Sequence, residues 1–238
     1  MDESLKKLIH LYDESVKNIS SKAKDQADKD KKRAYGGIVR ASKGSLVEFL
    51  AEELIKISWT ELNQKNNRLA FITEKKKIFL EKNYLDKIKD KDVKEYIQKN
   101  ITKFYYGIRS DIHVFIDETF VIAVECKAYT ENAMLKRILV DFTLLKKSIG
   151  KELDFILFQL ESQLTGDYSQ IYKDKIFGSH STHTIISQFD VQPTIITLLE
   201  GERGVNKAIH EKQFFKSLEK KSLIKCVDTL KNILKKYI

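Results

Sequence analysis

A single strand-like segment of this chain ends in a pair of opposite charges. The apolar residues 120–124 are followed directly by Glu125, Cys126 and Lys127. Side chains of a β-strand alternate between its two faces, so Glu125 and Lys127 share one face and Cys126 lies on the other as a small core residue. A charge at the end of a buried strand is costly unless it is paired or binds a metal ion. The fold must therefore bring a partner to these two side chains.

The order of strand and helix patterns along the chain predicts an α/β fold. Short β-branched or aromatic runs indicate strands at about residues 69–72, 104–108, 112–116, 120–127, 153–160 and 194–199. Apolar residues at helical spacing indicate helices at residues 2–31, from about 45, at 83–99, from an N-cap at Thr130 to about 148, and in the last 30 or so residues. Such a sequence forms a central sheet with helices on its faces.

Asp111 precedes the strand at 112–116 and is the expected partner of the charged pair. Residues 117–119 suit a hairpin turn, which places Asp111 and Glu125 on adjacent strands. Carboxylates from two strands can hold Mg²⁺ and promote attack on a phosphodiester, and a nearby lysine can stabilise the developing charge or help to deprotonate the water. In the alternative interpretation, Glu125 and Lys127 only pair with each other or are solvated at the strand end.

The same residues resemble a known motif. Ser110-Asp111, Val124-Glu125-Cys126-Lys127 and the helix after them look like the core of the PD-(D/E)xK nucleases, the fold of most type II restriction endonucleases. Ser110 stands where the family pattern has proline. The resemblance implies a restriction-endonuclease-like core with a mixed central sheet, with Asp111 and Glu125 as metal ligands and Lys127 as the charge-stabilising catalytic residue.

A second segment, Lys43 to Glu48, resembles the helix start of this core in related nucleases and Holliday-junction resolvases. There a glutamate four residues after the glycine helps to hold the metal, and Glu48 is the matching position after Gly44. Glu52, one helical turn further, could take the role instead. An exposed helix residue is the alternative interpretation of Glu48.

Several other polar residues are candidate DNA contacts. Arg109 and His113 share the strand face of Asp111 by alternation, so both could reach the scissile phosphate. Arg40 and Lys43 precede the expected helix N-terminus, which is a ready site for a phosphate. Residues 161–192 are polar, and we expect an irregular loop there that reads base edges. Its candidate contacts are Gln163, Lys173, His180 and His183. Ordinary surface solvation also explains each of these residues.

Length and charge are consistent with one DNA-binding domain. We expect a single nuclease domain over residues 1–238, with a catalytic core at about 43–160, DNA recognition at 161–192 and helical additions at both ends. The net charge of +9 favours nucleic acid as a partner, although only six of the 43 basic residues are arginine, a bias that an A/T-rich genome also produces. Two cysteines outside any disulfide or zinc pattern, no signal-peptide core and no apolar run of about 18 residues predict a cytoplasmic protein without a membrane span.

The resemblance implies a Mg²⁺-dependent type II restriction endonuclease, a hydrolase that breaks both strands of DNA at a short specific sequence. It also implies a homodimer, and a cognate DNA methyltransferase in the same genetic system. Two alternatives stay open. One is a structure-specific nuclease of the junction-resolvase or repair type, and the other is a basic DNA-binding module without catalysis.

Overall fold

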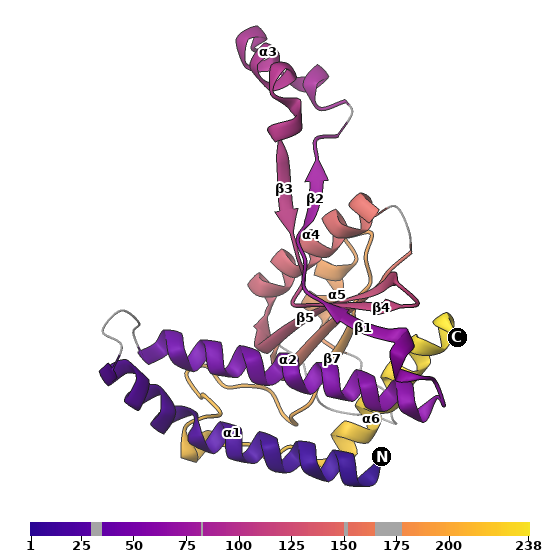
Figure 1. The fold of residues 1–238 in the computed structure, drawn as a ribbon. Helices are drawn as coiled ribbons and strands as arrows, with labels where there is room; N and C mark the ends of the chain where they lie inside the picture. Colours follow the sequence, from indigo (N-terminus) through magenta and orange to yellow (C-terminus); the bar gives the residue numbers. More distant parts are fainter. Residues whose placement is uncertain (30–34, 82, 150–151, 165–177) are drawn as a thin grey trace.

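A five-stranded mixed sheet forms the centre of the computed structural model, which describes residues 1–29, 35–81, 83–149, 152–164 and 178–238 (Figure 1). Antiparallel pairing joins the first three strands in the sheet order, and the last two are parallel to the third. This arrangement confirms the predicted α/β class with a mixed sheet. The strands, in sheet order, are β1 (Leu69–Ile72), β4 (Ile112–Ile116), β5 (Thr119–Glu131), β6 (Asp154–Gln163) and β7 (Thr194–Thr197).

Helices pack on both faces of the sheet. On one face lie α2 (Tyr35–Glu61) and α6 (Lys220–Leu234), with α1 (Asp2–Lys29) packed against them (Figure 1). On the other face lie α4 (Asn132–Ile149) and the short α5 (His180–Ile186). The side chains of β5 point alternately to the two helix layers: Val124 and Cys126 face the α2 side, and Ala123 faces the α4 side. None of the described helices is long and apolar enough to cross a membrane.

A tight hairpin between β4 and β5 sets the register of the strands that carry the charged residues. Asp117 and Glu118 both have positive φ angles, 47° and 64°, as a two-residue hairpin turn requires. The Arg68 guanidinium holds the turn, donating from Nε to Asp117 Oδ1 at 2.9 Å. The predicted hairpin is therefore confirmed.

The starts of two expected helices need correction. The helix expected from about residue 45 begins at Tyr35, because Ile38 and Val39 bury their side chains against Ile19 and so extend it by almost three turns. The helix expected at 83–99 is only α3 (Lys91–Lys99), capped by the Asp90 carboxylate. The predicted end of the first helix, residues 30–31, lies outside the described residues.

The strand β5 continues past the expected helix start. Thr130 was the predicted N-cap of the next helix, but it is a buried strand residue, and α4 begins at Asn132. Parallel pairing with β6 explains the extension, since Tyr129 pairs with Glu161 and Glu131 with Gln163. A backbone that is hydrogen-bonded to its neighbour stays extended despite a good capping residue.

A two-stranded ribbon projects from the body of the molecule (Figure 1). It pairs β2 (Lys76–Phe79), which the sequence patterns missed, with β3 (Tyr105–Ile108). The chain between the two strands includes α3 and lies at the far end of the ribbon. Ile78 and Ile108 pack against the core on the α4 side and so fix the base of the ribbon to the sheet. We call residues 74–109 the arm.

Candidate active site

The β4–β5 hairpin brings the three charged side chains of the motif together. Asp111 lies immediately before β4, and the register pairs Ile112 with Val124, the residue before Glu125. The Lys127 ammonium donates to Asp111 Oδ2 at 2.8 Å and to Glu125 Oε2 at 2.5 Å. The spatial convergence expected from the hairpin is thus present.

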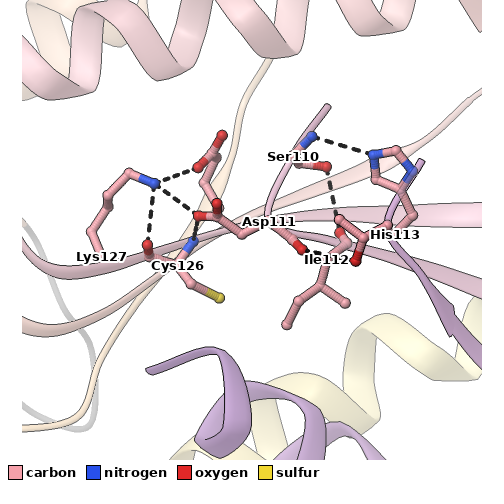
Figure 2. A network of polar contacts seen from close by, with 8 residues as sticks. Ser110, Asp111, Ile112, His113, Cys126 and Lys127 are labelled. Carbon is pink, nitrogen blue, oxygen red and sulfur yellow. Dashed lines mark hydrogen bonds and ion pairs between the residues drawn. The ribbon is translucent and has the colours of Figure 1, made fainter. Parts of the chain in front are cut away.

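The backbone of Cys126 completes the cluster (Figure 2). Its N–H donates to Asp111 Oδ2 at 2.7 Å, and its carbonyl oxygen accepts from Lys127 Nζ at 3.1 Å. Two carboxylates and one carbonyl therefore surround a single ammonium. The pattern of side-chain types did not indicate the carbonyl, because every residue has one.

Burial and proximity change the proton affinity of this cluster. Glu125 is 7% exposed, and this burial, reinforced by the neighbouring Asp111 carboxyl, raises the pKa of Glu125 well above its ordinary value. Burial also opposes ionisation of Asp111, but the hydrogen bond with Glu125 and the contacts with Lys127 outweigh it and hold the pKa of Asp111 below the usual range. The raised pKa belongs to Glu125 and the lowered pKa to Asp111, so Glu125 is the carboxyl of the pair that holds a proton more tightly. Two carboxyls this close together have a strong demand for positive charge.

The donor set fits a hard divalent cation. Asp111, Glu125 and the Cys126 carbonyl offer oxygen ligands, which Mg²⁺ prefers. Within the described ranges, no three carboxylate, thiol or imidazole side chains already converge as a metal site. The Lys127 ammonium contacts the oxygens that a cation would take, so it supplies the positive charge in this conformation.

Glu48 on α2 interacts electrostatically with this cluster. Burial raises the pKa of Glu48, and the next largest cause is the negative charge of Asp111. The positive charges of Lys127 and Arg109 act in the opposite direction. Glu52 instead lies 4.0 Å from the Lys56 ammonium on its own helix. Of the two glutamates, Glu48 therefore interacts with the charges of the candidate site, whereas Glu52 pairs within its own helix.

A cavity of about 400 Å³ opens beside the three charged residues. Its wall joins the base of the arm to α4, and it contains basic side chains that the motif did not identify. Sequence spacing could not find them, because these elements lie far apart along the chain. The cavity is lined by Lys75, Tyr106, Gly107, Ile108, Arg109, Asp111, Glu125, Lys127, Met134, Arg137, Ile138 and Asp141.

Strand alternation correctly placed Arg109 at the cavity but misjudged His113. The Arg109 side chain is exposed and lines the cavity, as a phosphate contact requires. His113 has no exposed surface; its ring packs 4.5 Å from that of Phe120, and its Nε2 accepts from the Ser110 N–H at 3.3 Å (Figure 2). The expectation that His113 reaches a phosphate is wrong for this conformation. It supports the turn that carries Asp111.

The predicted phosphate site at Arg40 and Lys43 does not lie at a helix N-terminus. Both residues lie inside α2, which begins at Tyr35, and Arg40 donates to the Gly36 carbonyl of the same helix. Lys43 is half-buried, and burial together with the charge of Arg203 lowers its pKa. It therefore lies near a different ion-pair cluster.

That second cluster is centred on the buried carboxylate of Glu161. Lys216 Nζ lies 3.0 Å from Glu161 Oε1, and Arg203 Nε lies 3.9 Å from Oε2. Arg203 also donates to Gln163 Oε1 at 2.9 Å and stacks 3.7 Å from the ring centroid of Tyr129. Gln163, a predicted base contact, is half-buried, and its side-chain oxygen is engaged by Arg203.

In the described parts of the expected recognition loop, residues 161–164 and 178–192, the chain is more regular than predicted. The start of that loop belongs to β6, and α5 occupies His180–Ile186, where Ser179 caps the helix by accepting from the Thr182 N–H. His180 and His183 are exposed on this helix. Lys173 lies outside the described residues.

Comparison with known proteins agrees with the chemistry of the site. No protein-family model and no solved structure matches the chain. The chain is, however, 50% identical over 220 residues to the type II restriction enzyme DdeI of Desulfomicrobium norvegicum, and the match covers 92% of this chain and 90% of that enzyme. Identity of this extent over nearly the whole of both chains indicates common descent. The chain belongs to the type II restriction endonucleases.

Proposed function

We propose that the chain is a Mg²⁺-dependent endonuclease that hydrolyses phosphodiester bonds in both strands of DNA at a short specific sequence. The observation that carries the proposal is the Lys127 ammonium shared by Asp111 and Glu125 at the wall of a cavity with further basic side chains. Similarity to a type II restriction enzyme supports the same activity.

Each residue of the cluster has a distinct role in this proposal. Asp111, Glu125 and the Cys126 carbonyl would hold the metal, with Glu48 close by. Bound Mg²⁺ supplies Lewis-acid chemistry, polarising the phosphate and lowering the pKa of a bound water. Lys127 donates hydrogen bonds to the attacking water or to a non-bridging phosphate oxygen and stabilises the negative charge of the transition state.

Other residues orient the reacting groups. Arg109 and Arg137 line the cavity and present planar guanidinium groups, which bind phosphate oxygens in pairs. The Cys126 N–H fixes the carboxylate of Asp111, and His113 fixes the backbone before it. These contacts hold the acidic side chains in place before the substrate arrives.

The proposal includes two partners of the chain. A second copy would present the same active site to the opposite strand of a palindromic sequence, since a two-fold axis of the protein then matches that of the DNA. A methyltransferase of the same specificity would protect the host DNA and act as a genetic partner.

Digestion of plasmid DNA tests the function. With Mg²⁺ we expect discrete fragments, and with EDTA no cleavage. Cleavage confined to branched DNA would replace the proposal with a structure-specific nuclease. Binding without cleavage in any divalent metal would leave only a DNA-binding module.

A further inference from the structure

The arm exposes an unusual combination of cations and aromatic rings. Its 36 residues contain eleven basic and six acidic residues, and so carry a net charge of +5 of the +9 of the whole chain. Seven of the 15 large apolar side chains that are exposed in the described chain also belong to it. Aromatic surface beside unneutralised positive charge is typical of an interaction surface.

Some of these side chains share one face of the ribbon. The register pairs Lys77 with Gly107 and Phe79 with Tyr105, so these four residues share a face. The Lys77 ammonium lies 4.5 Å from the ring centroid of Tyr105, and the rings of Phe79 and Tyr105 are 6.2 Å apart. Phe79 is 59% exposed and Tyr105 is 48% exposed.

The same face continues into the active-site cavity. The Lys75 side chain lies 3.5 Å from the position that a Cβ of residue 107 would take, and both Lys75 and Arg109 line the cavity. We call Lys75, Lys77, Phe79, Tyr105 and Arg109 the ribbon face. On the opposite face, Ile78 and Ile108 pack against the core, while Tyr106 is 57% exposed.

The positive charges of the ribbon face are not neutralised by the protein. Lys75, Lys77 and Arg109 form no ion pair with any residue in the described ranges, whereas Lys76 on the other face pairs with Glu74. Free cations that begin at the active site and extend outward fit a polyanion that runs through it.

We propose that the ribbon face binds the sugar–phosphate backbone of duplex DNA beside the scissile phosphate. This inference rests on the proposed function, which places DNA in the cavity. Four paired residues at about 3.4 Å each extend about 14 Å, the length of about four base pairs. Lys75 and Lys77 contact phosphates, and Phe79 and Tyr105 pack against sugars. Lysine is depleted in protein–protein interfaces and two such faces would repel, so a second copy of the chain fits this surface less well.

Binding of a short labelled duplex of mixed sequence, measured in EDTA at several salt concentrations, tests the proposal. Each phosphate contact contributes about 0.9 to the slope of log affinity against log salt. In the double variant Lys75→Ala/Lys77→Ala, this slope should be smaller than that of the wild type by about two, and DNA should bind about 60-fold more weakly near 0.1 M salt. Lys75→Arg/Lys77→Arg should restore both values, because it retains the charges.

The matched control is Lys7→Ala/Lys235→Ala, which removes one exposed lysine from α1 and one from the end of α6 and should bind as the wild type does. Both helices lie far from the arm (Figure 1). Wild-type slope and affinity in the arm variant would overturn the inference, even if the wild-type enzyme cuts DNA. A variant that changes oligomeric state with an unchanged slope would show instead that the arm joins two copies. Wild-type cleavage with Mg²⁺, scored in parallel, reports separately on the proposed function.

Discussion

Replacing Lys127 with methionine removes the only cation within hydrogen-bond reach of Asp111 and Glu125 among the described residues. Removing one partner of a buried ion pair lowers the free energy of unfolding by about 3–5 kcal/mol, because the remaining charge is left without a partner. Asp111 and Lys127 keep 30% and 27% of their side-chain surface exposed, which favours the lower value of about 3 kcal/mol. For a chain of this size we expect the melting temperature of the metal-free protein to fall by about 6–12 °C.

Mg²⁺ should compensate for much of this loss. The variant has no ammonium to compete for the carboxylate oxygens, so Mg²⁺ should raise its melting temperature more than that of the wild type. Catalysis should not recover, since an electrostatic contact to the transition state is worth about 10²–10³ in rate. Calorimetry with and without Mg²⁺ and single-turnover cleavage measure the two effects.

Lys235→Met serves as the control, because Lys235 is exposed and forms no ion pair in the described chain. It should melt and cut like the wild type. The reasoning about the cluster would be refuted by a Lys127→Met protein that melts at the wild-type temperature without metal. Wild-type cleavage by that variant would remove Lys127 from the catalytic residues.

Three further predictions concern titration and metal binding. Burial lowers the pKa of His113 from 6.5 to about 4. The contribution of neutral His113 to the free energy of unfolding is therefore complete above pH 6.5, and about 3 kcal/mol of it is lost as the pH falls to 4. Urea unfolding of His113→Gln over the same pH range should not show this loss. The proton held by Glu125 competes with Mg²⁺, so the Mg²⁺ concentration for half-maximal cleavage should fall as the pH rises towards 8, and a value independent of pH would contradict the raised pKa. Glu48→Gln should raise that concentration about tenfold and Glu52→Gln should not, and equal effects would rule out the assignment of Glu48.

The convergence of the candidate active-site residues could be predicted from the sequence because two local rules apply to them. Strand alternation places Glu125 and Lys127 on one face, and a short turn brings Asp111 to the adjacent strand. Alternation does not report depth, however. It assigned His113 to the correct strand but could not show that the ring of Phe120 covers it.

Helix limits were harder to predict because tertiary contacts override local preference. Glycine disfavours a helix interior, yet α2 passes through Gly36 and Gly37, since Ile38 and Val39 gain burial against Ile19. Thr130 is a good capping residue that remains in a strand because β6 pairs with the backbone around it.

The strand β2 of the arm escaped prediction for a related reason. Lysine and glutamate dominate residues 74–77, a composition that disfavours strands, but pairing with Tyr105–Ile108 supplies the backbone hydrogen bonds. Its contribution to the cavity depends on contacts between segments more than 30 residues apart in sequence, such as Tyr106 and Arg137. Single-sequence patterns contain no signal for such contacts.

Single-turnover cleavage by Glu125→Gln tests the central claim most directly, because the substitution keeps the shape of the side chain and removes its ability to ionise and bind Mg²⁺ as a carboxylate. Glu131→Gln is the control, since Glu131 is an exposed glutamate on the same strand. With Mg²⁺ and saturating enzyme, we expect Glu125→Gln to bind duplex DNA but to cut it at least about 10³-fold more slowly than the wild type, while Glu131→Gln retains the wild-type rate. Cleavage by Glu125→Gln at the wild-type rate would show that the chemistry takes place elsewhere in the molecule.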